Sequence, residues 1–197
     1  MTRDFETRIC LPDASGIALA AETIAAGHTV AVPTETVYGL AADARDSDAV
    51  ARIYAAKGRP SFNPLIVHVP DAEAAQALAR MSPLALRLAA AFWPGPLTLV
   101  LPVRPESGLS PLVTAGLPTV AIRCPAHPAM RALLEASGAP LAAPSANRSG
   151  AISPTSAEHV RTSLGGRIPL IIDGGPTARG IESTIVAPED GHVRLLR

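Results

Sequence analysis

Two segments of the chain carry polar side chains at a spacing suited to holding an anionic ligand. One glycine separates Lys57 from Arg59, and one alanine separates Ser145 from Asn147. An arginine can bind phosphate or carboxylate through two parallel N–H groups, whereas a lysine acts as a point charge. If the two segments meet in the fold, they form a site for a polyanion, most simply a nucleoside triphosphate.

Two further polar side chains lie in apolar strands. Side chains alternate between the faces of a strand, so His68 shares a face with Ile66, and Arg123 shares one with Thr119. A charged group at the end of an apolar strand needs a partner or a ligand. The residues alone leave two alternatives open: His68 could be a buried histidine bonded to protein groups, and Arg123 could extend to water at the sheet edge.

A polar segment, PTETVYGL at 33–40, follows a predicted strand, where α/β proteins often place binding groups. We predict it to be a turn, and its threonines could either bind a ligand or only stabilise that turn. The chain has no G-x-S-x-G around Ser145, which argues against a hydrolase nucleophile. It also has no P-loop or dinucleotide-binding glycine motif, and no His and Cys at zinc-ligand spacing.

Composition sets the protein class. The 197 residues are 48% hydrophobic and 17% charged, which predicts one compact domain over 1–197. The formal net charge of zero argues against a broad basic surface for nucleic acid. Cys10 and Cys124 suggest two free thiols. No secretory segment follows Met1, and prolines interrupt the most apolar run, so we expect a cytoplasmic protein without a membrane span.

The polar segments must be positioned by alternating helices and strands. Hydrophobic periodicity predicts helices over 15–26, 47–56, 71–79, 83–92, 128–136 and 156–164. It predicts strands over 29–32, 65–69, 97–101, 119–123, 141–143, 170–172, 183–186 and 193–196. The last strands are not separated by helices, which favours an α/β domain with a twisted mixed sheet over a parallel doubly wound one.

Five motifs together carry a family resemblance: residues 33–40, KGR at 57–59 with NPLIVH at 63–68, PGPLT at 94–98, PSAN at 144–147 and EST at 182–184. Because the five motifs occur in this order and at this spacing, the chain resembles the YrdC/TsaC family of L-threonylcarbamoyladenylate synthases. The motif-bearing core spans about 15–197. The resemblance implies a YrdC-like domain, with a mixed parallel and antiparallel sheet flanked by helices around a deep concave cavity.

The resemblance also implies a reaction and a set of site residues. L-threonine, bicarbonate and ATP, the last carrying Mg²⁺, would give threonylcarbamoyl-AMP and pyrophosphate. No protein metal site is expected. The catalytic residues would be Lys57, Arg59, Ser145 and Asn147. Threonine would be bound by Thr36, His68, Arg123 and Ser183. ATP would contact Arg59, Asn63, Thr119, Ser145 and Arg197. A tRNA threonylcarbamoyl transferase complex would take the product, and a weak RNA contact is possible.

Two departures and two alternatives accompany this resemblance. The chain ends at Arg197 without the C-terminal domain of some relatives, which implies the short form or a truncated chain. Ala143 stands where some relatives have a hydroxyl residue, so any contact there must come from backbone. The alternatives are a non-catalytic module that binds double-stranded RNA or tRNA, and a carbamoyltransferase relative that uses carbamoyl phosphate.

Overall fold

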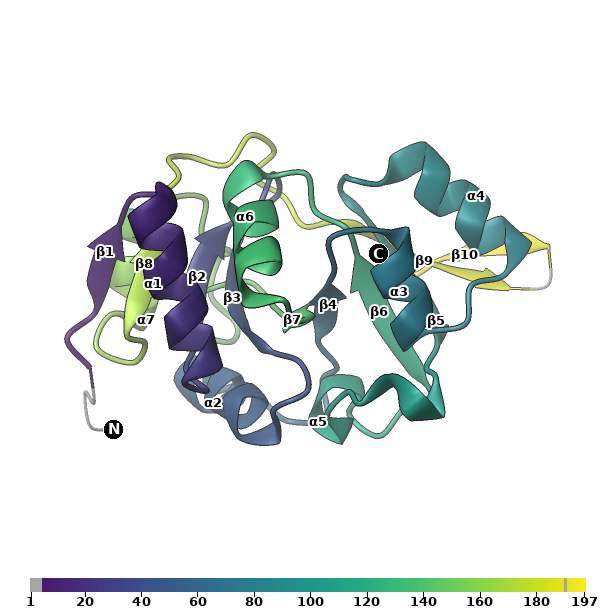
Figure 1. Ribbon diagram of the computed structural model, residues 1–197, viewed down its shortest axis with the longest axis horizontal. Coiled ribbons are helices and arrows are strands. Elements are labelled where there is room, and N and C mark those ends of the chain that lie inside the picture. Colours follow the sequence, from purple (N-terminus) through teal and green to yellow (C-terminus); the bar gives the residue numbers. More distant parts are fainter. Residues whose placement is uncertain (1–4, 190) are drawn as a thin grey trace.

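A single twisted sheet runs through the molecule, as the computed structural model shows for residues 5–189 and 191–197 (Figure 1). The strands of the described residues are β1 (Arg8–Cys10), β2 (Val30–Pro33), β3 (Tyr38–Asp43), β4 (Ile66–His68), β5 (Leu97–Pro102), β6 (Thr119–Arg123), β7 (Leu141–Ala142), β8 (Leu170–Ile172), β9 (Thr184–Glu189) and β10 (His192–Leu195). Their order across the sheet is β1-β8-β2-β3-β7-β4-β6-β5-β9-β10.

Both kinds of strand pairing occur, so the predicted mixed sheet is confirmed and the doubly wound alternative is wrong. Strand β8 pairs in parallel with β1 and β2, β4 with β6, and β5 with β9. Antiparallel pairs join β2 to β3, β3 to β7, β7 to β4, β6 to β5 and β9 to β10.

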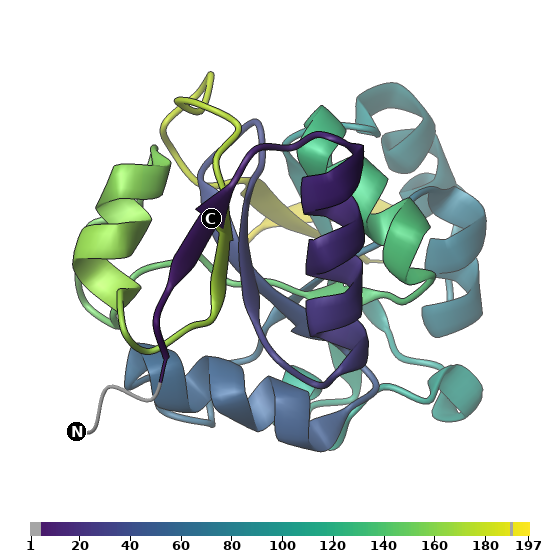
Figure 2. The same cartoon turned by 60° about the vertical axis from the view of Figure 1, so that its left-hand side comes forward.

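Helices cover both faces of the sheet. They are α1 (Ala14–Ala25), α2 (Ser47–Lys57), α3 (Ala72–Leu78), α4 (Pro83–Phe92), α5 (Pro111–Thr114), α6 (Pro128–Ser137) and α7 (Ala157–Leu164), with a 3₁₀ turn at Pro105–Ser107. Figure 2 shows α1 and α7 on opposite sides of the end of the sheet formed by β1 and β8. None of the helices in the described residues is long and apolar enough to cross a membrane.

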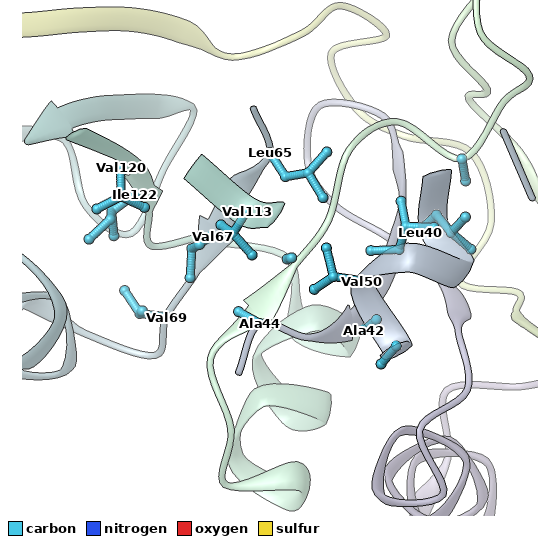
Figure 3. Packing of buried hydrophobic residues seen from close by; sticks show 14 of the residues in the cluster. Leu40, Ala42, Ala44, Val50, Leu65, Val67, Val69, Val113, Val120 and Ile122 are labelled. Carbon is cyan, nitrogen blue, oxygen red and sulfur yellow. The ribbon is translucent and has the colours of Figure 1, made fainter. Parts of the chain in front are cut away.

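Two hydrophobic clusters hold these layers together, because side chains alternate along each strand. On β2, Val30 and Val32 belong to the cluster under α1 and α6, while Ala31 belongs to the cluster on the other face. Figure 3 shows this other cluster, where Val67 from β4 lies beside Val113 and Ile122 lies beside Val120 on β6. This central packing fixes the strands that carry the polar side chains.

Three elements differ from the prediction. Strand β1 and helix α5 are too short to show a period of their own. The prediction of a turn over the whole of 33–40 is wrong, because only the residues between Pro33 and Tyr38 form a turn and β3 begins at Tyr38. The glycine and alanines of β3 have weak strand preference, and pairing with β2 and β7 on both sides decides its conformation.

Candidate functional site

One row of side chains crosses four neighbouring strands of the sheet. His68 on β4 is paired with Arg123 on β6, Arg123 is paired with Thr98 on β5, and Thr98 is paired with Ile185 on β9. Residues directly opposite each other in a sheet point to the same face. The row therefore brings together an imidazole, a guanidinium and a hydroxyl that are far apart in the sequence.

A cavity of about 290 Å³ lies over this row. Its lining combines the predicted site residues with neighbouring small and apolar ones: Thr34, Thr36, Val37, Gly39, Arg59, Pro64, Ile66, His68, Arg123, Ala143, Pro144, Ser145, Glu182, Ser183, Ile185 and Arg197. The segments predicted to meet therefore do meet. The depth expected of the cavity stays a prediction.

Arg123 is the buried cation of the cavity, only 3% exposed. Its Nη1 donates a hydrogen bond to Thr36 Oγ1 at 2.9 Å, and its Nε donates to the Gly95 carbonyl at 3.2 Å. Its Nη2 lies 2.6 Å from Glu35 Oε1, which is a close ion pair. The proposal that Arg123 only reaches water at the sheet edge is therefore wrong, because protein groups hold it in the interior.

Ser183 and Arg197 close the opposite side of the cavity. Ser183 Oγ is 2.8 Å from Thr98 Oγ1, and it accepts a hydrogen bond from Arg197 Nη2 at 3.2 Å. The Arg197 Nε donates to the Ser183 carbonyl at 3.1 Å, and the Arg197 carbonyl accepts from the Ile185 amide at 3.0 Å. These bonds hold a second guanidinium against the strand that carries Ser183.

Lys57 holds the segment 145–149 in place. Its side chain is 2% exposed, and its Nζ donates to the carbonyls of Ser145 and Asn147, the latter at 2.6 Å. Its own carbonyl accepts from the Ser149 amide at 2.8 Å. Asn147 turns its Nδ2 to the carbonyls of Arg148 and Ala151. Neither Lys57 nor Asn147 lines the cavity, so their predicted catalytic role would act through the loop or through the third ammonium N–H.

Of the remaining predicted residues, one lines the cavity and two do not. Arg59 lines it, and Gly58 makes this possible by ending α2 in the left-handed conformation at φ 59°. Asn63 precedes Pro64 and is not part of the lining. Thr119 begins β6, two residues before the Ala121 that pairs with Ile66, and does not line the cavity either. The contacts of Asn63 and Thr119 with ATP stay predictions.

His68 is held neutral by its surroundings. It is 2% exposed, and burial, together with the nearby Arg123 charge, lowers the pKa of its imidazole to about 3. No group in the described residues hydrogen-bonds to its buried Nδ1. A neutral imidazole that lines the cavity can accept or donate a hydrogen bond to a ligand, but it is not a base near pH 7.

Acid should destabilise the protein through His68. The unfolded chain binds a proton on His68 near pH 6.5, whereas the folded chain does so only near pH 3. Stability is therefore present above pH 6.5 and is lost as the pH falls toward 3, by up to about 1.4 kcal/mol per pH unit. Urea unfolding of the wild type and His68→Asn at pH 4 to 7 measures this. Parallel pH curves for the two chains would show that His68 does not titrate as stated.

Sequence reasoning missed several residues that complete the cavity. Thr34 Oγ1 lies 2.8 Å from Thr36 Oγ1 and accepts backbone N–H bonds within the turn. Ile185 lines the cavity two residues after Ser183, and alternation along the strand could have found it. Glu182 also lines the cavity, and Thr98 lies beneath it, where its hydroxyl meets that of Ser183. Both occur in the quoted motifs, but nothing in their local sequence shows which side chain they meet.

Comparisons with known proteins all relate the chain to one protein family. The model of the Sua5/YciO/YrdC family, described as telomere recombination, matches residues 22–197. A relative named threonylcarbamoyl-AMP synthase from Bacillus subtilis is 56% identical over 182 residues, which is 92% of this chain and 52% of the relative. One of the same name from Pyrococcus abyssi is 54% identical over 92% of this chain and 53% of the relative. The chain thus spans about half the length of these two relatives.

A solved structure supports the same relation. Sua5 from P. abyssi complexed with L-threonine superposes with a TM-score of 0.90 and 48% identity, covering 98% of this chain and 56% of the other. Both the extent of the family match and the fold agree with the five ordered motifs. This chain therefore belongs to the Sua5/YciO/YrdC family.

Proposed function

We propose that this chain binds L-threonine and ATP in the cavity and joins threonine, bicarbonate and AMP into threonylcarbamoyl-AMP. The observation that carries the proposal is the buried row of His68, Arg123 and Thr98 beneath a cavity that also holds Arg59 and Arg197. One guanidinium at the sheet suits an amino-acid carboxylate, and two near the rim suit phosphates. The names of the relatives and the threonine-bound structure of one neighbour point the same way.

The proposed reaction has two bond-forming steps. The neutral threonine amine attacks the carbon of bicarbonate, and water leaves to give a carbamate anion. A carbamate oxygen then attacks the α-phosphorus of ATP, the bond to the β-phosphate oxygen breaks, and pyrophosphate departs. Both steps bring anions together, so the chain contributes by positioning substrates and by placing Arg59 and Arg197 where negative charge develops.

Within this proposal the side chains have separate tasks. Arg123 and Thr36 take the threonine carboxylate, and His68 and Ser183 offer hydrogen bonds to its amine and hydroxyl. Ser145 faces the nucleotide, and Lys57 and Asn147 keep the Ser145 loop in position. The predicted contact of Lys57 with phosphate would use its third N–H.

Magnesium would arrive bound to ATP. Residues 5–189 and 191–197 contain no group of three or more His, Cys, Asp or Glu side chains able to hold a metal, and Glu182 is the carboxylate in the cavity lining. Phosphate and water oxygens therefore fit as most of its ligands. When bound, the ion would neutralise charge on the phosphates. We further propose that the reaction takes place in the cytoplasm. A tRNA threonylcarbamoyl transferase complex would then take the product.

A double-label experiment tests the function. The chain is incubated with L-threonine, ATP labelled at the α-phosphate and labelled bicarbonate, and pyrophosphate is measured alongside the products. We expect one product carrying both labels, and pyrophosphate release that requires threonine. Release that is equal without threonine would show that threonine is not the substrate. Two labels in separate products would show that no carbamoyl-AMP bond forms.

A further inference from the structure

We propose that Glu35 is a positioning residue for the substrate carboxylate: it holds the Arg123 guanidinium in the orientation that it presents to the cavity. The inference rests on the proposed function, which gives the amino-acid carboxylate to Arg123. Glu35 itself is absent from the cavity lining among the described residues, whereas Arg123 and Thr36 belong to it. Glu35 would therefore act through Arg123 rather than touch the substrate.

Both carboxylate oxygens of Glu35 are engaged by the protein. Oε1 lies 2.6 Å from Arg123 Nη2, and Oε2 accepts a hydrogen bond from the Ala126 amide at 3.1 Å. The side chains of the pair are only 14% and 4% exposed. Glu35 comes from the turn after β2, and Ala126 from the loop after β6. The carboxylate thus links two loops and cannot turn without breaking a bond on one side.

The backbone around Glu35 is held as well. The Arg179 amide donates to the Glu35 carbonyl at 3.1 Å, and the Gly180 amide donates to the Thr36 carbonyl at 3.0 Å. The segment that makes these bonds leads directly to Ser183, which lines the cavity. The carboxylate is therefore fixed relative to the strands that form the cavity, which is what a positioning residue requires.

A count of donors shows what the arrangement leaves for a ligand. A guanidinium has five N–H groups. The Gly95 carbonyl accepts the Nε–H and Thr36 Oγ1 accepts one N–H of Nη1, while Glu35 Oε1 pairs with Nη2 by charge at 2.6 Å. Nη1 keeps a second N–H, which a carboxylate oxygen of a ligand can accept.

The charge of Glu35 also selects the class of ligand. Because Glu35 already neutralises Arg123, a bound carboxylate leaves this cluster with one net negative charge. The ammonium group of an amino acid offsets that charge, and a plain carboxylic acid cannot. The cavity should therefore prefer zwitterionic amino acids to hydroxy acids of the same shape.

Glu35→Gln tests the proposal, because it keeps the shape of the side chain and removes its charge. Calorimetric titration of the same preparation with L-threonine and with a non-hydrolysable ATP analogue gives two affinities. We expect the threonine Kd to rise about 10- to 100-fold and that of the analogue to change by less than about twofold. Glu158→Gln, which breaks the exposed 2.8 Å pair with Arg161, should change neither.

The outcomes separate the inference from the proposed function. Unchanged or tighter threonine binding by Glu35→Gln would overturn the inference, and so would equal weakening of both ligands. A wild-type chain that binds no threonine would overturn the proposed function and the inference with it. The titration stoichiometry reports the folded fraction. If Glu35→Gln does not fold, Glu35→Asp decides: its shorter carboxylate should still raise the threonine Kd by about threefold or more and leave the analogue unaffected.

Discussion

Replacing Arg123 by methionine should lower threonine-dependent pyrophosphate release by about 10³-fold. The guanidinium is the buried cation in the cavity lining, and its Nη1 keeps an N–H for a substrate carboxylate beyond the one that Thr36 accepts. Methionine fills part of the volume but offers no donor. Arg194→Met is the matched control, because it removes an exposed arginine that pairs with Glu189 at 2.7 Å and should leave the rate unchanged.

Stability measurements on the same variants distinguish lost binding from lost folding. Arg123→Met leaves the Glu35 carboxylate partly buried without its partner, which should cost about 3–5 kcal/mol in the free energy of unfolding. Adding Glu35→Gln removes that charge, so the double variant should regain most of the stability but none of the activity. Recovery of activity in the double variant would contradict a role for Arg123 in binding substrate.

Replacing Lys57 by methionine should give the second-largest effect, a rate loss of about 100-fold. The expected cause is displacement of the loop that carries Ser145, because the Lys57 ammonium bonds the carbonyls of Ser145 and Asn147. Pyrophosphate release under saturating ATP measures the loss. A variant that keeps its rate within a few-fold would show that the loop needs no such bonds.

Lys57→Met should also lower the free energy of unfolding. Two carbonyls lose their partner, which costs about 1–3 kcal/mol each where they are buried. Burial, together with the nearby Arg59 charge, lowers the Lys57 pKa to about 8, which shows that the buried ammonium is itself unfavourable. Removing that ammonium therefore offsets part of the stability lost at the two carbonyls. Arg52→Met on the same helix is the control. Arg52 does not line the cavity, and its Nη1 donates a 2.7 Å hydrogen bond to the Gly27 carbonyl.

Local sequence was sufficient for the elements with a clear period or a clear cap. The helix that ends at Lys57 was predicted from its apolar spacing and from Gly58, which the structure places at the left-handed cap position. The strand with His68 was predicted from its apolar run, and alternation correctly put Ile66 and His68 on one face, which the structure shows to be the cavity side. These features depend on residues within one or two turns of the chain.

The partners of the polar side chains could not be predicted in this way. Nothing near Arg123 in the sequence indicates that Glu35, 88 positions earlier, would neutralise it. The same holds for Lys57, whose ammonium bonds two carbonyls of a distant loop. A burial cost drives each of these contacts, and burial is a property of the packed chain rather than of a segment.

By itself the sequence determined which polar groups the protein offers, which strands and helices carry them, and which family they resemble. The tertiary structure decided which of these groups share the cavity. Strand order places His68, Arg123, Thr98 and Ile185 in one row. The physical reason is that pairing register and the burial of both sheet faces are settled only when distant strands pack together, and they alone set which side chains become neighbours.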